Sequence, residues 1–361
     1  MNRSKKIAVI SVFDHLNYGN NLQRYAVQNA IRKRGLEPVS LCVRSHPLLG
    51  KVKDRVTSPN SDRLRSRNFL QFQRENRIAV RDCKPQHLIQ YVSEGFAGAV
   101  IGSDQVWNPL YGLGSRKDGL ACLEGVPSAR KITLCPSFGI TFEDMPDDRR
   151  SLYSNWLADF YRISVREDSG ADIVRRLTGK DAQVLIDPTM GVTADEWRRL
   201  ADYSVCPKGD YILTYYLGDG DSSLTQAVAK MAENEGVGIV NLMDKSSDLY
   251  THGPGAFIAL IDKALFVVTD SFHGSAFSLM LHTDFAVVQR AQQGMSNMLT
   301  RVQTLCSKFE CSDRFVEYDA PVLPNIGLDW GSFEVRLKQE RKAYNEFLDA
   351  ELTRICSSKM L

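Results

Sequence analysis

The stretch KIAVISVFDHLNYGNNLQRYAVQNAIRKRGLEPVSLCV, residues 6–43, decides the predicted fold. Its first part, residues 6–13, is an apolar run rich in β-branched side chains, which is typical of a buried strand. Apolar residues then recur at helical spacing until Gly35, and residues 38–43 have the composition of a second strand. A strand, a helix and a strand in direct succession indicate a βαβ unit and therefore a parallel sheet.

The same alternation continues on both sides of a polar stretch at residues 191–209, which we interpret as a domain boundary. The basic, polar residues 46–87 are expected to form a surface excursion. Four further strands are expected to extend the first sheet: residues 98–102, 131–134, 163–165 and 184–186. Four more are expected in the second domain: residues 211–217, 237–242, 264–269 and 284–288.

This pattern predicts an α/β protein of two Rossmann-like domains whose parallel sheets face a cleft, the arrangement called GT-B in glycosyltransferases. We place the first domain at residues 1–190 and the second at 209–330. The C-terminal segment, 331–361, is expected to be a helix that could pack back on the first domain.

The composition is that of a soluble globular protein, with 43% hydrophobic and 24% charged residues in a chain of 361. A net charge of +2, from 45 basic and 43 acidic residues, is too weak for a general nucleic-acid binder. The best apolar run is strand-sized, shorter than the roughly 18 residues of a membrane helix. The eight scattered cysteines form no CxxC pair, and the start has the pattern of a strand rather than a signal peptide, so we expect reduced thiols and a cytoplasmic location.

A polar corner follows the first strand, at the sheet edge where α/β proteins bind ligands. Gly19 can adopt backbone angles that other residues avoid, and the amide side chains offer both donors and acceptors. These groups suit sugar hydroxyls or a phosphate, and the alternative is a capped Asn/Gly turn. The candidate binding residues are Asn17, Tyr18, Gly19, Asn20 and Gln23.

A second polar corner follows the strand at residues 98–102. An aromatic side chain could stack on a sugar ring there, while carboxylate and amide groups bond the hydroxyls. The alternative is a capped helix start with Trp107 in the core. The candidates are Asp104 as a catalytic base, and Gly102, Ser103, Gln105, Trp107 and Asn108 for binding.

A third corner follows the strand at residues 264–269, where small and polar residues lead into a helix. Free N–H groups and the helix dipole favour a phosphate at such a start. A histidine there is placed for proton transfer, although a structural histidine is the alternative. The candidates are His273 and Asp270 for catalysis, and Ser271, Gly274 and Ser275 for binding.

Two arginines follow predicted strands, Arg166 in the first domain and Arg290 in the second. Either guanidinium could clamp a phosphate or carboxylate through two parallel hydrogen bonds. The alternative is a solvated surface position, as for most of the basic residues.

Five segments, in order, resemble the polysaccharide pyruvyl transferase family. They are Asn17-Tyr18-Gly19 with Leu22-Gln23, Gly102-Ser103-Asp104-Gln105-Val106-Trp107-Asn108-Pro109, Ser164-Val165-Arg166-Glu167, Asp187-Pro188-Thr189 and Thr269-Asp270-Ser271-Phe272-His273-Gly274. The resemblance implies a GT-B-like fold, phosphoenolpyruvate as donor, and a pyruvate ketal on a bacterial polysaccharide, cell-wall glycan or lipid-linked precursor as product. It implies that His273 lies next to the donor and Arg166 in the donor site. Some family members have an arginine two positions before this histidine, where this chain has Ser271.

The expected chemistry needs a proton donor, anion clamps and a base for the sugar hydroxyls. We assign His273 as the acid, Arg166 and Arg290 as clamps, and Asp104 or Asp270 as the base. The acceptor then binds the first domain, which also contributes to the donor site, and the donor binds the second. No cofactor or metal is required, and a lipid-linked acceptor would bring peripheral contact with a membrane. The alternatives are a GT-B glycosyltransferase using a nucleotide sugar and a carbohydrate-binding protein with a decayed site, and the oligomeric state stays open.

Overall fold

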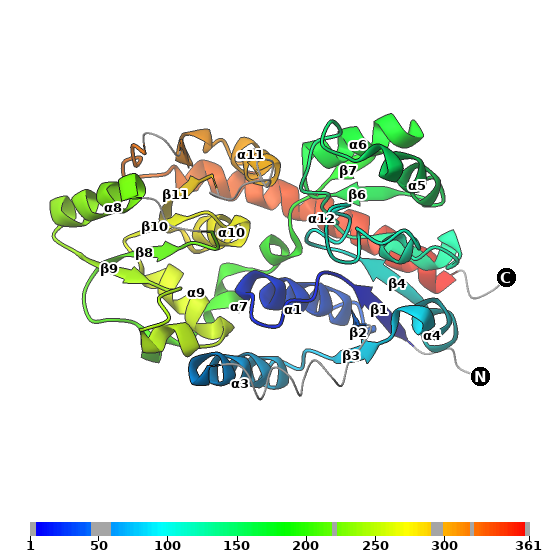
Figure 1. Cartoon of the computed structure of the whole chain (residues 1–361), viewed down its shortest axis with the longest axis horizontal. Helices are drawn as coiled ribbons and strands as arrows, with labels where there is room; N and C mark the ends of the chain where they lie inside the picture. Colours follow the sequence, from blue (N-terminus) through cyan, green and yellow to red (C-terminus); the bar gives the residue numbers. More distant parts are fainter. Residues whose placement is uncertain (1–4, 45–58, 219–221, 290–298, 318–320, 358–361) are drawn as a thin grey trace. The chain divides into compact units, whose positions relative to one another are not determined.

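The computed structural model describes residues 5–44, 59–218, 222–289, 299–317 and 321–357. The chain divides into two compact units, each with its own parallel sheet (Figure 1). Unit 1 comprises Met1–Ser58, Gln73–Gly191 and Glu340–Leu361, and unit 2 comprises Pro59–Phe72 and Val192–Gln339. The sequence placed residues 59–72 in the first domain, whereas in the structure they belong to unit 2.

The main sheet of unit 1 has five parallel strands in the order β3-β2-β1-β4-β5. Its centre is apolar because nearly every residue of β1 and all of β4 are buried, as the continuous hydrophobic runs predicted. The strands are β1 (Lys6–Ile10), β2 (Glu37–Val43), β3 (Val80–Cys83), β4 (Gly98–Ile101) and β5 (Lys131–Thr133). The helices of this unit before its last segment are α1 (Tyr18–Arg32), α4 (Leu88–Gly95), α5 (Asp147–Ala158) and α6 (Asp168–Thr178).

The polar segment expected as an excursion contains two elements that the sequence did not reveal. The helix α3 (Asn60–Glu75) comes first, and β3 then joins the sheet of unit 1 as its edge strand. Within unit 2, Asn68 Nδ2 of α3 donates to the Thr251 carbonyl at 2.8 Å. Strand β3 is short and half polar, so its sequence lacks the apolar run by which the other strands were recognised.

The strands β6 (Ile163–Val165) and β7 (Ala182–Val184) form a separate two-stranded sheet, so the prediction that they extend the first sheet was wrong. Side-chain hydroxyls replace the backbone ladder between β5 and β6. The Ser164 N–H donates to Thr133 Oγ1 at 2.7 Å, and Ser164 Oγ donates to the Thr133 carbonyl at 2.9 Å. The two strands therefore stay side by side without sharing a sheet.

The sheet of unit 2 also has five parallel strands, in the order β12-β11-β10-β8-β9. They are β8 (Tyr211–Tyr215), β9 (Gly238–Asn241), β10 (Phe266–Thr269), β11 (Asp284–Val288) and β12 (Phe315–Val316). Helix α7 (Ala194–Arg198) precedes β8, and the helices between the strands are α8 (Ser222–Glu235), α9 (Pro254–Lys263), α10 (Phe272–Leu281) and α11 (Leu299–Lys308). The sequence pattern did not predict α11 and β12.

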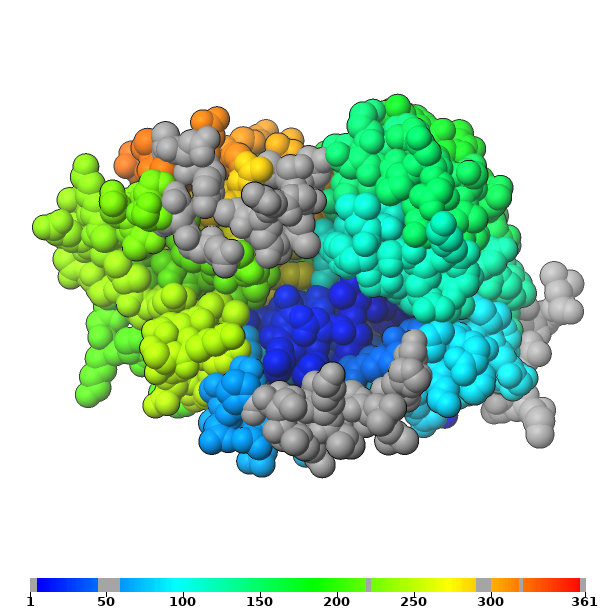
Figure 2. Space-filling view, in the orientation of Figure 1, coloured from blue at the N-terminus to red at the C-terminus, as the bar shows by residue number. Residues whose placement is uncertain are grey.

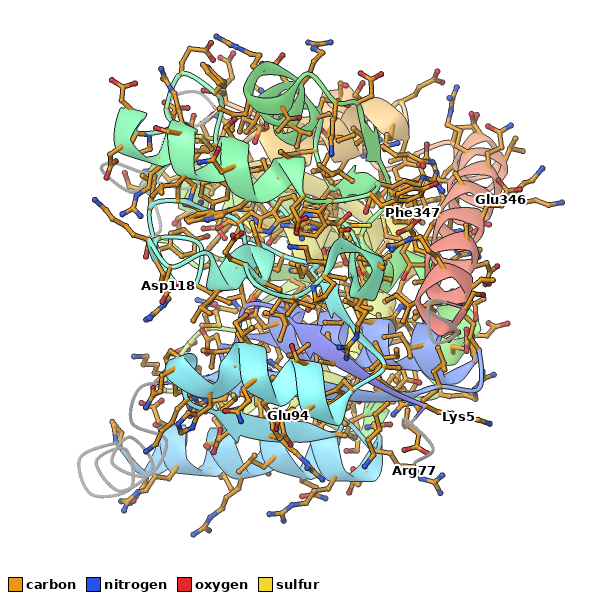
Figure 3. The ribbon with its side chains drawn as sticks, turned by 90° about the vertical axis from the view of Figure 1, so that its right-hand side faces the viewer. Lys5, Arg77, Glu94, Asp118, Glu346 and Phe347 are labelled. Atoms are coloured by element: carbon orange, nitrogen blue, oxygen red, sulfur yellow. The ribbon has the colours of Figure 1, made fainter. Side chains whose placement is uncertain are left out.

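The long last helix, α12 (Trp330–Ser357), belongs to unit 2 up to Gln339 and to unit 1 from Glu340 onward. Figure 3 shows Phe347 turned toward the body of unit 1 and Glu346 turned away from it. Phe347 is 2% exposed, and Arg341 Nε donates to the Met190 carbonyl at 2.7 Å. Packing of apolar residues and a hydrogen bond from the Arg341 side chain to a backbone carbonyl thus attach this end of the helix to unit 1.

The segment between β4 and β6 builds much of the remaining surface of unit 1. In the space-filling view it forms a continuous cyan to green face (Figure 2). Buried beneath it, the rings of Trp107, Phe138 and Tyr153 belong to the hydrophobic core of the unit. This core supports the polar loops that follow β4, β5 and β6.

Candidate functional site

The turn after β4 places polar residues at the carboxyl edge of the sheet of unit 1. Gly102 has a φ of +116°, and a Cβ at this position would collide with the Leu134 carbonyl, so only glycine fits. The next residue, Ser103, is fully buried, and its Oγ lies 2.9 Å from Asp187 Oδ2 and 2.8 Å from the Cys135 carbonyl. Gly102 thus allows the chain to turn Ser103 and Asp104 inward.

Arg166 follows β6 and is the charged centre of this edge. Its Nη1 donates to Asp187 Oδ2 at 2.9 Å, its Nη2 donates to Asp104 Oδ1 at 3.2 Å, and its Nε lies 3.9 Å from Glu167 Oε2. Burial alone would lower the pKa of the guanidinium, but the carboxylates of Asp104, Asp187 and Glu167 raise it above its ordinary value. Arg166 is 3% exposed, so it is a buried cation held by three acidic side chains.

The carboxylate of Asp104 links the first two predicted corners. Asn20 Nδ2 donates to Asp104 Oδ2, and the Gln105 N–H donates to Asp104 Oδ1 at 2.9 Å. Asn20 is held in turn by the N-cap of α1, because its N–H donates to Asn17 Oδ1 at 3.0 Å. Within unit 1 the structure therefore brings together Asn17, Asn20, Asp104 and Arg166.

Gln23 lies on α1 beside this group and is fully buried. Its Oε1 lies 3.2 Å from Ser11 Oγ, which in turn lies 2.7 Å from the Ser103 carbonyl. The Nε2 atom of Gln23 has no hydrogen-bond partner among the described residues. A buried amide donor of this kind can bond a ligand oxygen.

Two carboxylates of this site were not singled out from the sequence as functional. Asp187 accepts from Arg166 and also from the Thr189 N–H at 2.9 Å. Glu167 Oε1 accepts from Ser137 Oγ at 2.9 Å and from the Phe138 N–H at 2.8 Å, so it fixes the loop after β5. Their position directly after β7 and β6 is the signal that could have identified them.

The structure corrects the expectation that Trp107 presents a face to a sugar. Its side chain is fully buried, its ring lies 5.3 Å from that of Phe138 between centroids, and its Nε1 donates to the Ala121 carbonyl at 3.0 Å. Asn108 is also buried, and its Oδ1 accepts from the Leu110 N–H at 2.9 Å. The core alternative therefore holds for Trp107, and Asn108 stabilises a turn.

Tyr18 and Gly19 open the helix α1 and are likewise buried. Tyr18 is fully buried as part of the hydrophobic core of the chain. These two residues thus place α1, and the polar groups of this corner are supplied by the amide side chains around them.

The corner in unit 2 lies between β10 and α10. Ser271 is the N-cap of α10, and its Oγ accepts from the Gly274 N–H at 3.3 Å. A Cβ on Gly274 would collide with the side chain of Thr269, so glycine is needed for this close approach. Ser275 is fully buried, with its Oγ 3.2 Å from the Ser271 carbonyl. The predicted helix start is thus present, with a serine cap.

Asp270 anchors the neighbouring loop. Its two oxygens accept from the Leu217 N–H at 2.7 Å and from the Gly218 N–H at 2.8 Å. Tyr216 lies in the same loop, and burial, followed by the charge of Asp270, raises the pKa of its phenol above the ordinary value. The Tyr216 hydroxyl has no hydrogen-bond partner among the described residues. Tyr216 is a polar group of this corner that the sequence did not indicate.

His273 is the second residue of α10 and is 6% exposed. Its ring packs edge-on against Phe272, with 5.4 Å between centroids. The imidazole is thus held at a helix start, where N–H groups and the dipole favour an anion. Arg290, the other predicted clamp, lies outside the described residues.

Comparisons with known proteins match this chain to a family and to solved structures. The family described as polysaccharide pyruvyl transferase matches residues 17–290. A structure described as a UDP-N-acetylglucosamine 2-epimerase from Listeria monocytogenes is similar, with a TM-score of 0.52 and 12% identity over 94% of this chain and 90% of that one. A glycosyltransferase from Rickettsia africae has a TM-score of 0.47 and 9% identity, over 100% and 97% of the two chains. A search of curated proteins finds no significant match.

The first of these structures confirms the predicted fold class, an α/β protein of two Rossmann-like units of the GT-B-like type. None of the helices within the described ranges combines the length and the apolar character that a bilayer span requires. Across the same ranges, no three His, Cys, Asp or Glu side chains are grouped as metal ligands would be.

Proposed function

Because this chain belongs to the polysaccharide pyruvyl transferase family, we propose that it transfers a pyruvyl group from phosphoenolpyruvate to a sugar as a ketal, with release of phosphate. The acceptor is a sugar of a bacterial polysaccharide, a cell-wall glycan or a lipid-linked precursor. The eight cysteines are free thiols, which supports a reducing, cytoplasmic location.

The start of α10 supports the donor assignment, and it is the observation on which the proposal depends most. A phosphate or carboxylate of the donor would be stabilised there by the positive end of the helix dipole and would accept from the Ser271 hydroxyl. Ser271 stands where some family members have an arginine, so this anion site relies on hydrogen bonds more than on side-chain charge. Arg290 follows β11 in the sequence, and we propose it as a further clamp.

His273 is the proposed acid because an imidazole can hold or release a proton near neutral pH. It gives a proton to the C3 methylene of phosphoenolpyruvate, and C2 becomes electron-poor. A sugar hydroxyl adds to C2 and loses its proton to a base. A second hydroxyl of the same sugar then displaces phosphate from C2, and its proton leaves with phosphate or returns to His273. The balanced result is a cyclic ketal with a new methyl group, plus inorganic phosphate.

The acceptor side of the proposal rests on unit 1. Asp104 is the proposed base, and Asn20 and Gln23 are amides placed to bond sugar hydroxyls. Asp270 is the alternative base, and its two oxygens accept from the backbone N–H groups of Leu217 and Gly218.

The family resemblance implies a donor-binding role for Arg166, and the contacts of unit 1 support a different one. Its guanidinium already bonds Asp104 and Asp187 and lies near Glu167. Three carboxylates around one cation leave an excess of negative charge there, which disfavours the binding of a further anion. We therefore propose that Arg166 is a positioning residue, which holds the Asp104 carboxylate in place.

A donor screen by ligand-induced thermal shift tests the proposed function. Phosphoenolpyruvate at 100 times its Kd should stabilise the folded protein by about 2.7 kcal/mol, and the stabilisation should be lost when the start of α10 is altered. A panel of nucleotide sugars should give no shift that depends on the start of α10. Stabilisation by a nucleotide sugar without any by phosphoenolpyruvate would favour the glycosyltransferase alternative instead.

A further inference from the structure

Two arginines of unit 1 that the proposed chemistry does not use contact the same aromatic ring. The guanidinium carbon of Arg24, on α1, lies 4.1 Å from the ring centre of Phe13, and that of Arg44, just after β2, lies 4.8 Å from it. Phe13 is in the loop after β1. Both strands end here at the carboxyl edge of the sheet, where ligands bind in α/β proteins.

The charge of Arg24 has no counterion in the part of the chain that the structure describes. Arg24 is 2% exposed, its Nη1 donates to Asn21 Oδ1 at 3.2 Å, and its Nη2 has no partner. Arg44 bonds Cys42 Sγ through its Nε at 2.7 Å, and neither arginine has a carboxylate within ion-pair distance among the described residues. Arg166, by contrast, is buried among three carboxylates.

Burial lowers the pKa of the Arg24 guanidinium to about 10, and the charge of Arg44 lowers it as well, although Cys42 and Asp14 act in the opposite direction. The folded protein thus holds Arg24 in a place that disfavours its charge. A cation–π contact with Phe13 offsets only part of this cost. An anion bound beside it would offset the rest.

The position of Arg24 is fixed by its neighbours. Asn21 Oδ1, which accepts from Arg24, also accepts from Gln73 Nε2 at 2.6 Å, and Asn21 Nδ2 donates to the Asn17 carbonyl at 2.8 Å. A guanidinium held in place in this way is preorganised for a ligand, because little side-chain freedom is lost on binding. Phe13 and Arg44 are only partly buried, so solvent reaches these two members of the cluster, with Arg24 behind them.

The cluster lies one helical turn from the proposed acceptor site. Arg24 is four residues after Asn20 on α1, so both lie on the same face of the helix. Asn20 bonds Asp104, the proposed base. A helical turn rises about 5.4 Å, which is comparable to the distance from a sugar ring to a phosphate group linked to it.

We propose that Arg24 and Arg44 form a binding subsite for the phosphate or diphosphate group that is esterified to the acceptor sugar. The name acceptor rests on the proposed function, whereas the anion site itself does not. Two arginines suit a phosphate ester because a guanidinium can donate two parallel hydrogen bonds to its oxygens. A diphosphate ester occurs both in lipid-linked saccharides and in nucleotide sugars, so the test must separate these two sources.

Isothermal titration with inorganic pyrophosphate tests the subsite directly, using the full chain and the variants Arg24→Met and Arg44→Met. Each variant should weaken pyrophosphate binding by about ten- to a hundredfold, since each removes a charged hydrogen-bond donor. Arg24→Met should in addition raise the melting temperature of the unliganded protein, because a buried charge without a counterion is replaced by an apolar side chain. A purely structural arginine would give a lower melting temperature and unchanged binding.

Arg65→Met is the matched control. Arg65 is also 2% exposed and lies over an aromatic ring, 4.5 Å from the ring centre of Tyr250, but its Nη1 donates to the Tyr250 carbonyl. This variant should melt at a lower temperature and bind pyrophosphate like the wild type. If Arg24→Met does not fold, Arg44→Met decides, because Arg44 is only partly buried. Unchanged pyrophosphate affinity in Arg44→Met would then overturn the proposal.

Farnesyl diphosphate and UDP identify the source of the ligand. Arg24-dependent binding of farnesyl diphosphate supports a subsite for a lipid-linked acceptor, and Arg24-dependent binding of UDP supports one for a nucleotide-linked acceptor. Failure of all three diphosphates to bind in an Arg24-dependent way overturns the subsite. Phosphoenolpyruvate is titrated in parallel: if it does not bind while pyrophosphate does, the proposed function fails and the anion site stands.

Discussion

Arg166 Nη1 lies 2.9 Å from Asp187 Oδ2, and both side chains are almost completely buried. The same guanidinium bonds Asp104, so one cation holds carboxylates that follow two different strands. A buried pair of this kind is costly to break, because removal of one partner leaves the other charge uncompensated. The proposed positioning role of Arg166 can therefore be tested through the stability of the fold.

Arg166→Ala should lower the free energy of unfolding by about 3–5 kcal/mol, as measured by urea denaturation. Arg166→Lys should recover part of this loss, since it keeps the charge but not the two-pronged geometry. Arg175→Ala is the control, because the exposed pair of Arg175 with Asp172 on α6 should contribute only about 0–1 kcal/mol. An Arg166→Ala protein of wild-type stability that binds phosphoenolpyruvate poorly would show that Arg166 is a donor ligand instead.

Trp107 provides a test of the core assignment. Trp107→Ala should lower the free energy of unfolding by about 3–5 kcal/mol, because it opens a cavity between the rings of Phe138 and Phe160. Trp107→Phe should lower it less, because it keeps an apolar ring in that space. Saccharide affinity of a folded Trp107→Phe protein should equal that of the wild type. A selective loss of saccharide binding would restore Trp107 as a sugar platform.

Two substitutions of Ser271 distinguish its role as the N-cap of α10 from a role in anion binding at the same place. Ser271→Ala should lower the free energy of unfolding by about 0.5–2 kcal/mol, since the N-cap hydrogen bond to the Gly274 N–H is lost. Ser271→Asp keeps a capping side chain but adds a negative charge at the proposed donor site. Its stability should match that of the wild type, while phosphoenolpyruvate binding weakens. Wild-type donor affinity in Ser271→Asp would place the donor elsewhere.

Because of the buried thiol of Cys42, the free energy of unfolding should depend on pH in the alkaline range. Burial raises the pKa of its thiol to about 11, whereas a thiol in an unfolded chain titrates near 8.5. As the pH rises above about 8.5, the thiol in the unfolded chain loses its proton while the thiol in the folded protein keeps it. The protonated Cys42 thiol therefore contributes its full share of the stability below about pH 8.5, and this share is lost progressively toward pH 11. The wild type should therefore lose up to about 1.4 kcal/mol per pH unit more than Cys42→Ala between these limits. Parallel pH profiles of the two proteins would refute the assignment.

Periodicity in the sequence was sufficient to predict the parallel sheets and the two corners that follow β4 and β10. Periodicity did not predict the features of the fold that depend on tertiary contacts. The separation of β6 from the main sheet depends on the hydroxyls of Thr133 and Ser164, which a pattern of apolar residues does not reveal. The polar strand β3 was missed for a related reason, since its place in the sheet comes from pairing with β2.

The sequence also indicated only some of the residues of the candidate site. Asp104, Asn20 and Gln23 were proposed because polar residues after a strand indicate a ligand-binding edge, and their roles stay predictions. Trp107 was placed wrongly because an aromatic residue in a polar loop has the same sequence signature whether it packs inward or binds a sugar. Arg24 could not be recognised either, since only the structure shows that no carboxylate among the described residues pairs with it.

His273 carries the proposed acid function, and His273→Gln keeps the size of the side chain and a hydrogen-bonding amide without a transferable proton. General acid catalysis contributes about 10²- to 10⁴-fold, so kcat should fall by that factor while phosphoenolpyruvate binding persists. Titration calorimetry with phosphoenolpyruvate is the control for binding. A kcat within about threefold of the wild type corresponds to less than 1 kcal/mol and would make His273 a binding or structural residue.

The most direct test of the central claim follows the pyruvyl carbons. The protein is incubated in D₂O with phosphoenolpyruvate labelled with ¹³C at C2 and a saccharide fraction from a bacterial cell envelope, and the products are analysed by mass spectrometry. We predict a saccharide that carries the ¹³C label and one deuterium in its new methyl group, together with an equal amount of released phosphate. An unlabelled saccharide, with the label recovered only in phosphoenolpyruvate or free pyruvate, would contradict the proposed pyruvyl transfer.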